Sequence, residues 1–211
     1  MTDELVFYTN PMSRGRIVRW MLEEVGQPYR TELLDYATTM KAPAYLAVNP
    51  MGKVPAIKHG EQVVTEAAAI IAYLADAFPQ AGLAPAPNDR LRGTYYRWLF
   101  FAAGPVEAAV TNKSLGVVPP PERRGSVGYG SLEAVLDALE SAVKDREYIV
   151  GDRFTGADLY VGSHIGWGMQ FGTIEKRPAF VQYAGRIMGR PAAVRAREID
   201  DALLAAAKSA S

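Results

Sequence analysis

The stretch from Asn49 to Ala69, NPMGKVPAIKHGEQVVTEAAA, carries residue types that could hold a peptide-like ligand. A short strand is expected to begin at Val54-Pro55, and because proline cannot donate a ladder hydrogen bond, Pro55 belongs at a strand end or edge. An X-Pro bond in such a tight setting is a candidate for the cis form, which would turn the amide and carbonyl of Val54 away from the sheet. Those two groups could then pair with the main chain of an extended ligand.

Glu66 adds a charged group to the same stretch. Thr65-Glu66 opens an apolar pattern that predicts a helix over 66–78, and the first turn of a helix has free N–H groups and a dipole that favour anions. A ligand with a peptide main chain, an ammonium group and a carboxylate would fit these parts. The simpler alternative for Glu66 is a carboxylate that interacts only with the helix dipole.

The elements that must position this stretch follow from hydrophobic periodicity. The chain opens with a strand, a helix and a second strand, which together form a right-handed parallel unit. A hairpin and a helix come next. The expected elements are a strand over 5–9, a helix after Ser13 that stops at Gly26, a strand over 29–34, a hairpin of 54–57 and 62–64 turning at His59-Gly60, and a helix over 66–78.

The run NPMGKVPAI followed by TEAAAIIAYL resembles the glutathione-binding half of the cytosolic glutathione S-transferases, in particular bacterial, serine-type members similar to the theta, zeta and beta classes. The resemblance implies a thioredoxin-like βαβ-α-ββ-α domain over 1–79. It also implies that Val54, beside Pro55, pairs with the cysteinyl main chain of glutathione, and that Glu66 holds the γ-glutamyl end. Ala67 stands where the family usually has serine, so its N–H remains while a hydroxyl contact is lost.

The rest of the chain predicts a second, all-helical domain. Residues 80–88 contain one glycine and two prolines and are expected to be a linker, and 89–211 has almost no strand signal. Gly104-Pro105 should kink or end the first helix, and 113–130 is expected to be a long loop. Helices are predicted over 91–112, 132–146, 157–171, 179–188 and 192–207.

A second motif lies at the start of the third of these helices. Thr155 and Asp158 have the spacing of a capping box, in which each side chain satisfies the other residue's exposed N–H. Preceded by a Val-Gly-Asp-x-Phe run, the box is similar to the folding motif of the glutathione transferase C-terminal domain. Both halves of the chain therefore resemble the family in the right order, and Asp158 is interpreted as a cap and not as a catalytic residue.

Thiolate chemistry is the activity that this resemblance implies. The glutathione thiol has a pKa near 8.5 or slightly above, so an enzyme must stabilise its thiolate by roughly 1 kcal/mol or more at neutral pH. A hydroxyl at a helix N-terminus can do so by donating a hydrogen bond, and Ser13 is that hydroxyl, close to the place of the serine in serine-type classes. Asn10 is the second candidate and Tyr8 the third, while a plain helix cap is the alternative role for Ser13.

Two further groups of residues complete the expected site. Lys53 could bind the glycyl carboxylate of glutathione, with Lys41 as the alternative, although either could be a solvated lysine. The second substrate should be apolar, and the aromatics of the helical half suggest its place. Most of these aromatics should be core. Phe101 or Trp167 is expected to line the electrophile site.

The composition excludes several classes of function. The 23 basic and 23 acidic residues give no net charge, so neither nucleic acid nor an anionic membrane is favoured as a partner. No apolar run reaches about 18 residues, no signal peptide is recognised and cysteine is absent, which predicts a cytoplasmic protein without disulfides. His59 and His164 have no partner at metal-ligand spacing, so no metal site is expected.

The leading interpretation is a transferase that adds the glutathione thiolate to an electrophilic carbon, with glutathione as co-substrate and, as the family implies, a homodimer. A glutathione-dependent isomerase or reductase is an alternative, although Ser13-Arg14-Gly15 does not match the Ser-Ser-Cys run of the zeta-class isomerase. Thiol transfer through a protein cysteine is excluded because there is none. A non-catalytic glutathione-binding or interaction module on the same fold is the remaining alternative.

Overall fold

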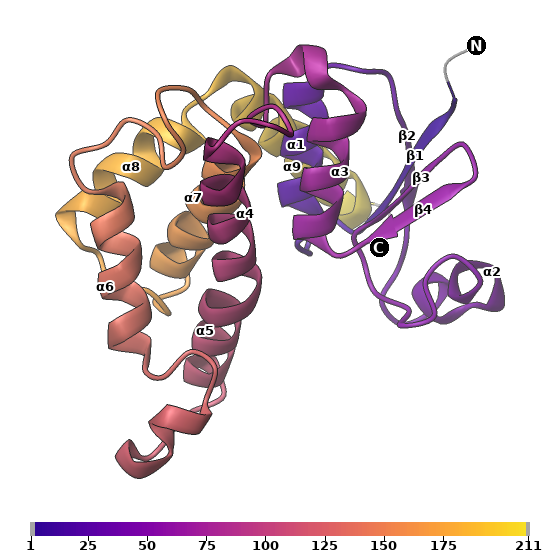
Figure 1. Ribbon diagram of the computed structural model, residues 1–211. Helices are drawn as coiled ribbons and strands as arrows, with labels where there is room; N and C mark the ends of the chain where they lie inside the picture. Colours follow the sequence, from indigo (N-terminus) through magenta and orange to yellow (C-terminus); the bar gives the residue numbers. More distant parts are fainter. Residues whose placement is uncertain (1–2, 210–211) are drawn as a thin grey trace. The chain divides into compact units, whose positions relative to one another are not determined.

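The computed structural model describes residues 3–209 and begins with a four-stranded mixed sheet in the order β2-β1-β3-β4 (Figure 1). Strand β1 pairs in parallel with β2 and antiparallel with β3, which in turn pairs antiparallel with β4. With the intervening helices, the sheet confirms the expected βαβ-α-ββ-α order. The elements are β1 Leu5–Thr9, α1 Gly15–Val25, β2 Arg30–Leu33, α2 Pro43–Leu46, β3 Ala56–His59, β4 Gln62–Thr65 and α3 Ala67–Ala77.

The two helices α1 and α3 pack on the same face of the sheet because both present apolar stripes to it. Ile17, Met21, Ile70 and Leu74 are at most 2% exposed, as is Phe7 of β1. Helix α1 stops where expected, since Gly26 takes a left-handed φ of +70° and its N–H caps the carbonyl of Leu22.

Three local predictions for this half differ from the structure by one or two residues. The strand expected over 54–57 is β3, Ala56–His59, so Val54 and Pro55 lie before it and not in it. The hairpin turn is made by Gly60 and Glu61, while His59 stays in β3 and pairs with Gln62. Gly60 has a φ of +58°, which suits the first position of a two-residue hairpin turn. Helix α3 begins at Ala67, so Glu66 is the residue before the helix and not part of its first turn.

The second part of the chain is helical, as predicted, with one interruption that Pro105 explains. The expected helix over 91–112 is divided into α4 (Leu91–Phe101), a π-helical segment (Ala102–Val106) and α5 (Glu107–Ser114). Proline lacks an N–H and clashes with the preceding turn, so the helix widens there. The remaining helices are α6 Leu132–Val143, α7 Gly156–Gln170, α8 Pro178–Met188 and α9 Pro191–Ser209, with a 3₁₀ turn over Pro121–Ser126 in the long loop.

The glycines of α7 allow α8 to pack very close to it. A Cβ at Gly162 would lie 2.9 Å from Cγ2 of Ile187, and one at Gly166 would overlap Sδ of Met188. Glycine costs about 1 kcal/mol relative to alanine inside a helix. Here that cost is offset by the close packing of α7 and α8.

The capping box is present at the start of α7 and is part of a larger buried network. The Asp158 carboxylate accepts hydrogen bonds from the N–H groups of Thr155 (2.9 Å) and Ile149 (2.7 Å), and from the hydroxyls of Thr155 and Tyr183. Burial raises the pKa of this carboxyl above its ordinary value, while the four donors oppose that shift. Asp158 therefore joins α7, α8 and the loop before α7, which agrees with its interpretation as a structural residue.

The contacts divide the chain into two compact units, residues up to 81 with those from 191 onward, and residues 82–190. The first will be called the thioredoxin-like unit and the second the helical unit. Helix α9, expected among the other helices, belongs by its contacts to the thioredoxin-like unit. It packs on α1, where Nε of Arg19 lies 2.7 Å from Oδ1 of Asp200, with both side chains at most 2% exposed.

The expected linker over 80–88 is also attached to one unit. The carbonyl of Leu83 accepts the N–H of Gly156 at 2.8 Å, and the carbonyl of Pro85 accepts a hydrogen bond from Arg92 at 2.6 Å. These residues therefore belong to the helical unit from Gly82 onward. Over residues 3–209, no helix combines the length and apolar character needed to cross a bilayer.

Candidate functional site

The strand register brings three of the predicted site segments to one edge of the sheet. Tyr8, Ala56 and Thr65 lie side by side on β1, β3 and β4. The loop that contains Asn10 and Ser13 follows Tyr8, the Val54-Pro55 pair precedes Ala56, and Glu66 follows Thr65. Residues far apart in the sequence therefore meet at this edge, which will be called the site edge.

Val54 offers its main chain at the site edge. The Val54–Pro55 bond is cis, as expected from the sequence. Within residues 3–209, neither the N–H nor the C=O of Val54 makes a turn, cap or loop hydrogen bond. Val54 is only half-buried, and its side chain packs on Met40, Tyr45 and Ala56. Its two main-chain polar groups are therefore open to an extended ligand.

Glu66 lies at the start of α3 in a conformation that is rare for its residue type. Its φ is +65° and its ψ is 120°, and its exposed side chain makes no capping hydrogen bond. Such backbone strain costs about 1–3 kcal/mol and is concentrated at functional sites in proteins. Ala67, only 7% exposed, is the first residue of α3 and has one of the free N–H groups of a helix start. A carboxylate and unpaired N–H groups are thus neighbours here.

Ser13 lies two residues before α1, one residue earlier than a plain N-cap. Its hydroxyl donates to the carbonyl of Asn10 at 2.6 Å and accepts the N–H of Gly15 at 2.9 Å. Gly15 must be glycine, since a Cβ there would overlap Oγ1 of the buried Thr9 and press on Ser13. The hydroxyl therefore satisfies one free N–H of the helix, and its proton can be turned elsewhere because a hydroxyl rotates.

The two other candidates for thiol activation are held differently. The Asn10 amide donates to the carbonyl of Leu34 at 2.8 Å, and its oxygen accepts the N–H of Met12 at 2.9 Å. One of the two amide hydrogens is thus engaged. Tyr8 is half-buried in the strand, with its ring centroid 5.5 Å from that of Tyr45. Ser13 is the candidate of the three at the beginning of a helix.

The two candidate lysines have different surroundings. The ammonium group of Lys41 donates to the carbonyls of Gly52 (2.7 Å) and Met51 (3.3 Å), so it is bound to the loop before Val54. Lys53 is exposed, and its ammonium group makes no ion pair or hydrogen bond within the described part of the chain. Lys53 is therefore the lysine that is available to a ligand carboxylate.

Sequence reasoning did not identify the two side chains that hold the Lys53 main chain. The carbonyl of Lys53 accepts hydrogen bonds from the Tyr45 hydroxyl (2.6 Å) and from the Asn49 amide (2.8 Å). Burial raises the pKa of Tyr45 to about 12, so its hydroxyl remains a donor at neutral pH. The only signal for this contact in the sequence is the position of Asn49 four residues before Lys53, because the region of Tyr45 has no clear periodicity.

The predicted electrophile residues lie in the helical unit. Phe101 is the last residue of α4, next to the π-helical segment, and its ring meets that of Trp98 edge-on at 5.5 Å. Trp167 lies near the end of α7, and both residues are half-buried. Helices α4 and α7 pack on each other within the unit. Their place as lining of a substrate site stays a prediction.

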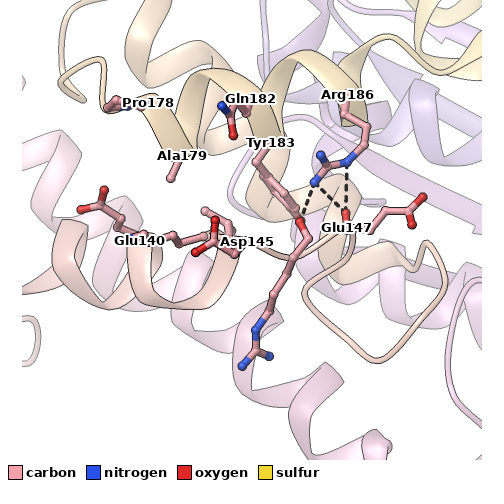
Figure 2. Close-up of a pocket in the computed structure, with 11 residues that line it drawn as sticks. Glu140, Asp145, Glu147, Pro178, Ala179, Gln182, Tyr183 and Arg186 are labelled. Atoms are coloured by element: carbon pink, nitrogen blue, oxygen red, sulfur yellow. Dashed lines mark hydrogen bonds between the residues drawn. The ribbon is translucent and has the colours of Figure 1, made fainter.

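A cavity of about 680 Å³ lies elsewhere in the helical unit, at the end of α6 and along α8 (Figure 2). Neither Phe101 nor Trp167 lines it, and most of the residues that line it have polar or charged side chains. Arg186 reaches from α8 to the loop before α7 and donates to the carbonyls of Arg146 (2.7 Å) and Glu147 (2.9 Å). This cavity is therefore not the site to which the sequence analysis assigned the two aromatics.

Comparison with known proteins agrees with the observed fold. Residues 12–77 match the family model for the glutathione S-transferase N-terminal domain, and 128–191 match that for the C-terminal domain. The glutathione S-transferase GstA of Escherichia coli O157:H7 is 33% identical over 166 residues, which cover 76% of this chain and 77% of that protein. The chain belongs to the glutathione S-transferase family.

Solved structures of glutathione S-transferases have the same fold. A glutathione transferase from Methylococcus capsulatus is 29% identical with a TM-score of 0.77, over 93% of this chain and 98% of that one. A sphingomonad glutathione S-transferase in complex with glutathione is 28% identical with a TM-score of 0.75, over the same shares. In this member of the family, no cluster of three or more metal-binding side chains occurs among the described residues.

Proposed function

We propose that this glutathione S-transferase conjugates the glutathione thiolate to apolar electrophiles, with Ser13 stabilising the thiolate. The observation that carries the proposal is the convergence of unpaired groups at the site edge: the Val54 main chain, the Glu66 carboxylate and the N-terminus of α3. These match the amide, ammonium and carboxylate groups of a γ-glutamyl tripeptide. The same edge contains the hydroxyl of Ser13 at the beginning of α1.

The tripeptide would be bound along the site edge by complementary polar groups. The N–H and C=O of Val54 pair with the cysteinyl main chain, and Glu66 pairs with the ammonium group of the γ-glutamyl residue. The N–H of Ala67 at the start of α3 binds the carboxylate of that residue, without the hydroxyl contact that serine supplies in relatives. Lys53, whose ammonium is available, binds the glycyl carboxylate.

Ser13 has the geometry to lower the pKa of a nearby thiol. Its hydroxyl now donates to the carbonyl of Asn10, and rotation about the Cβ–Oγ bond would direct that proton to the sulfur. The N–H of Gly15 would still donate to Oγ, which makes the hydroxyl a stronger donor. The thiolate then attacks the electrophilic carbon, the carbon–sulfur bond forms as the leaving group departs, and orientation supplies much of the rate.

The apolar second substrate is assigned to the helical unit. Phe101 and Trp167 are half-buried aromatics near the ends of two helices that pack on each other, and such side chains present a large apolar surface to a ligand. A homodimer, which the family resemblance implies, is part of the same proposal. So is a cytoplasmic location.

The test compares wild type with Ser13→Ala in an aryl halide conjugation assay as a function of pH. We expect kcat/KM near neutral pH to fall by about 10- to 100-fold, and the apparent pKa of bound glutathione to rise, because one donor to the thiolate is lost. Ser131→Ala is the matched control, since its hydroxyl caps α6 by accepting the N–H of Ala134 and lies in the other unit. That variant should leave the pH profile unchanged.

The same experiment separates the alternatives. Retention on immobilised glutathione without any thiol-dependent turnover would favour a binding module over an enzyme. Full activity in Ser13→Ala would assign thiol activation to Asn10 or Tyr8, and equal effects of Ser13→Ala and Ser131→Ala would reduce Ser13 to a structural role.

A further inference from the structure

The peptide group between Lys53 and Val54 joins the interior of the thioredoxin-like unit to the site edge. Its carbonyl belongs to Lys53 and its N–H to Val54, so the two point in opposite directions across one planar unit. The carbonyl accepts two hydrogen bonds, from the Tyr45 hydroxyl at 2.6 Å and the Asn49 amide at 2.8 Å. A carbonyl oxygen has two lone pairs, and both are used here.

The two donors are themselves held firmly. Tyr45 and Asn49 are only 3% and 4% exposed. The Tyr45 ring packs on Met40 and on the ring of Tyr8, and the Asn49 side-chain oxygen accepts the N–H of Met51 at 3.1 Å. Neither side chain can leave the Lys53 carbonyl without losing other contacts, so the plane of the peptide group is fixed.

We infer that Tyr45 and Asn49 are positioning residues that clamp the Lys53 carbonyl and thereby aim the Val54 N–H at an acceptor carbonyl of the ligand. The inference rests on the proposed glutathione site and adds two residues to it. Two hydrogen bonds to one end of a peptide group also polarise it, which makes the N–H at the other end a stronger donor. The clamp thus both orients and strengthens the hydrogen bond that the Val54 N–H would donate to a carbonyl of the ligand.

The clamp serves the binding of the tripeptide and not the activation of its sulfur. The N–H of Val54 is directed at the main chain of the ligand, while the sulfur is assigned to Ser13. Loss of the clamp should therefore weaken glutathione binding and raise KM for glutathione, with a much smaller change in kcat at saturation and none in the thiol pKa. If the two residues had a purely structural role, their loss would lower the melting temperature and would not raise KM selectively over kcat.

The experiment measures glutathione and S-methylglutathione affinity by titration calorimetry for the full chain and for Tyr45→Phe and Asn49→Ala. Each variant should bind both ligands about five- to tenfold more weakly, since each loses one hydrogen bond of the clamp. Tyr45→Phe keeps the ring and its packing, so it tests the inference even if Asn49→Ala does not fold. Steady-state kinetics of the folded variants supply the KM and kcat values.

Tyr29→Phe is the matched control. Tyr29 is another tyrosine of the same unit whose hydroxyl donates to Glu23 at 2.7 Å, with a pKa that burial raises to about 12. It should lose stability comparable to Tyr45→Phe and keep wild-type affinity. If Tyr45→Phe also keeps wild-type affinity, the clamp is refuted while the proposed function stands. If the wild-type protein itself binds neither glutathione nor S-methylglutathione, both the clamp and the proposed function are refuted.

Discussion

Two carboxylates at helix starts show how differently the two units use the same chemistry. Asp158 of the helical unit is fully buried and accepts four hydrogen bonds at the start of α7. Glu66 of the thioredoxin-like unit is exposed at the start of α3 and accepts none from the helix it precedes. A carboxylate whose partners are all internal stabilises the fold, whereas one left open in a strained backbone is available to a ligand.

The largest effect in this comparison should come from Asp158→Ala. Four donors, two of them main-chain N–H groups, would lose their acceptor in a buried place, so we expect the free energy of unfolding to fall by about 3 to 4 kcal/mol. Denaturant titration followed by circular dichroism measures this. Asp152→Ala, at an exposed neighbouring position, should change it by less than about 0.5 kcal/mol. Similar losses in the two variants would show that the network is not a main source of stability.

The close packing of the helical unit predicts opposite signs for two glycine substitutions. Gly168→Ala should lower the free energy of unfolding by about 1 to 2 kcal/mol, because its methyl group would overlap Cβ and Cγ1 of Ile174, a β-branched side chain that is only 1% exposed. Gly185→Ala should raise it by up to about 1 kcal/mol, since nothing lies near an added Cβ there and alanine is the better helix former. Thermal unfolding of both variants measures the sign of each change in the free energy of unfolding. The same sign in both would contradict the packing argument.

Strain at the site edge predicts that stability and binding change in opposite directions in Glu66→Gly. Glycine adopts a φ of +65° without steric cost, so the free energy of unfolding should rise by about 1 kcal/mol. Affinity for glutathione should fall about tenfold because the partner of the ammonium group is lost. Calorimetry of unfolding and of binding gives both numbers.

Asp145→Gly provides the control in the other unit. Asp145 also has a positive φ, of +55°, at the end of α6. Asp145→Gly should also raise the free energy of unfolding, but by less than Glu66→Gly, because aspartate tolerates a positive φ better than glutamate does. It should leave the affinity for glutathione unchanged. If Glu66→Gly kept full affinity, the carboxylate would not be a ligand group.

The smallest effects are expected from substitutions of Lys53 and Lys41, and these two substitutions should affect different properties. Lys53→Met should weaken glutathione binding by about threefold, with little change in stability, because an exposed ion pair contributes at most about 1 kcal/mol. Lys41→Met should instead lower the free energy of unfolding by about 1 kcal/mol, since its ammonium group holds the Gly52 carbonyl. Binding titrations at low and high salt check the first claim. A loss of affinity that salt does not reduce would contradict it.

Much of the fold could be predicted from local sequence, because strong periodicity, glycine stops and proline positions act within a few residues. The strand over 5–9, the stop at Gly26, the change at Pro105 and the capping box at Thr155 are all of this kind. The Val54-Pro55 pair and its cis bond were also predicted in this way.

The parts that sequence reasoning missed depend on contacts between distant residues. The place of α9 follows from a buried ion pair between residues 181 positions apart, which no local pattern indicates. Tyr45 lies in α2, a helix of only four residues, which is too short to show a periodic pattern. Its hydroxyl donates to a main-chain carbonyl, a contact that no charge in the sequence indicates. The shift of the hairpin turn by one residue depended on the conformation of Gly60.

The pairing of Arg19 with Asp200 has a consequence for how the molecule is made. During synthesis, the sheet and α1 leave the ribosome long before residue 200, so the guanidinium of Arg19 has no carboxylate to neutralise it at that stage. A buried charge without its partner is strongly unfavourable. Arg19 is buried where α9 packs on α1, so this face of α1 stays uncovered until a helix translated more than a hundred residues later is made, and a fragment that stops at residue 81 would lack that helix.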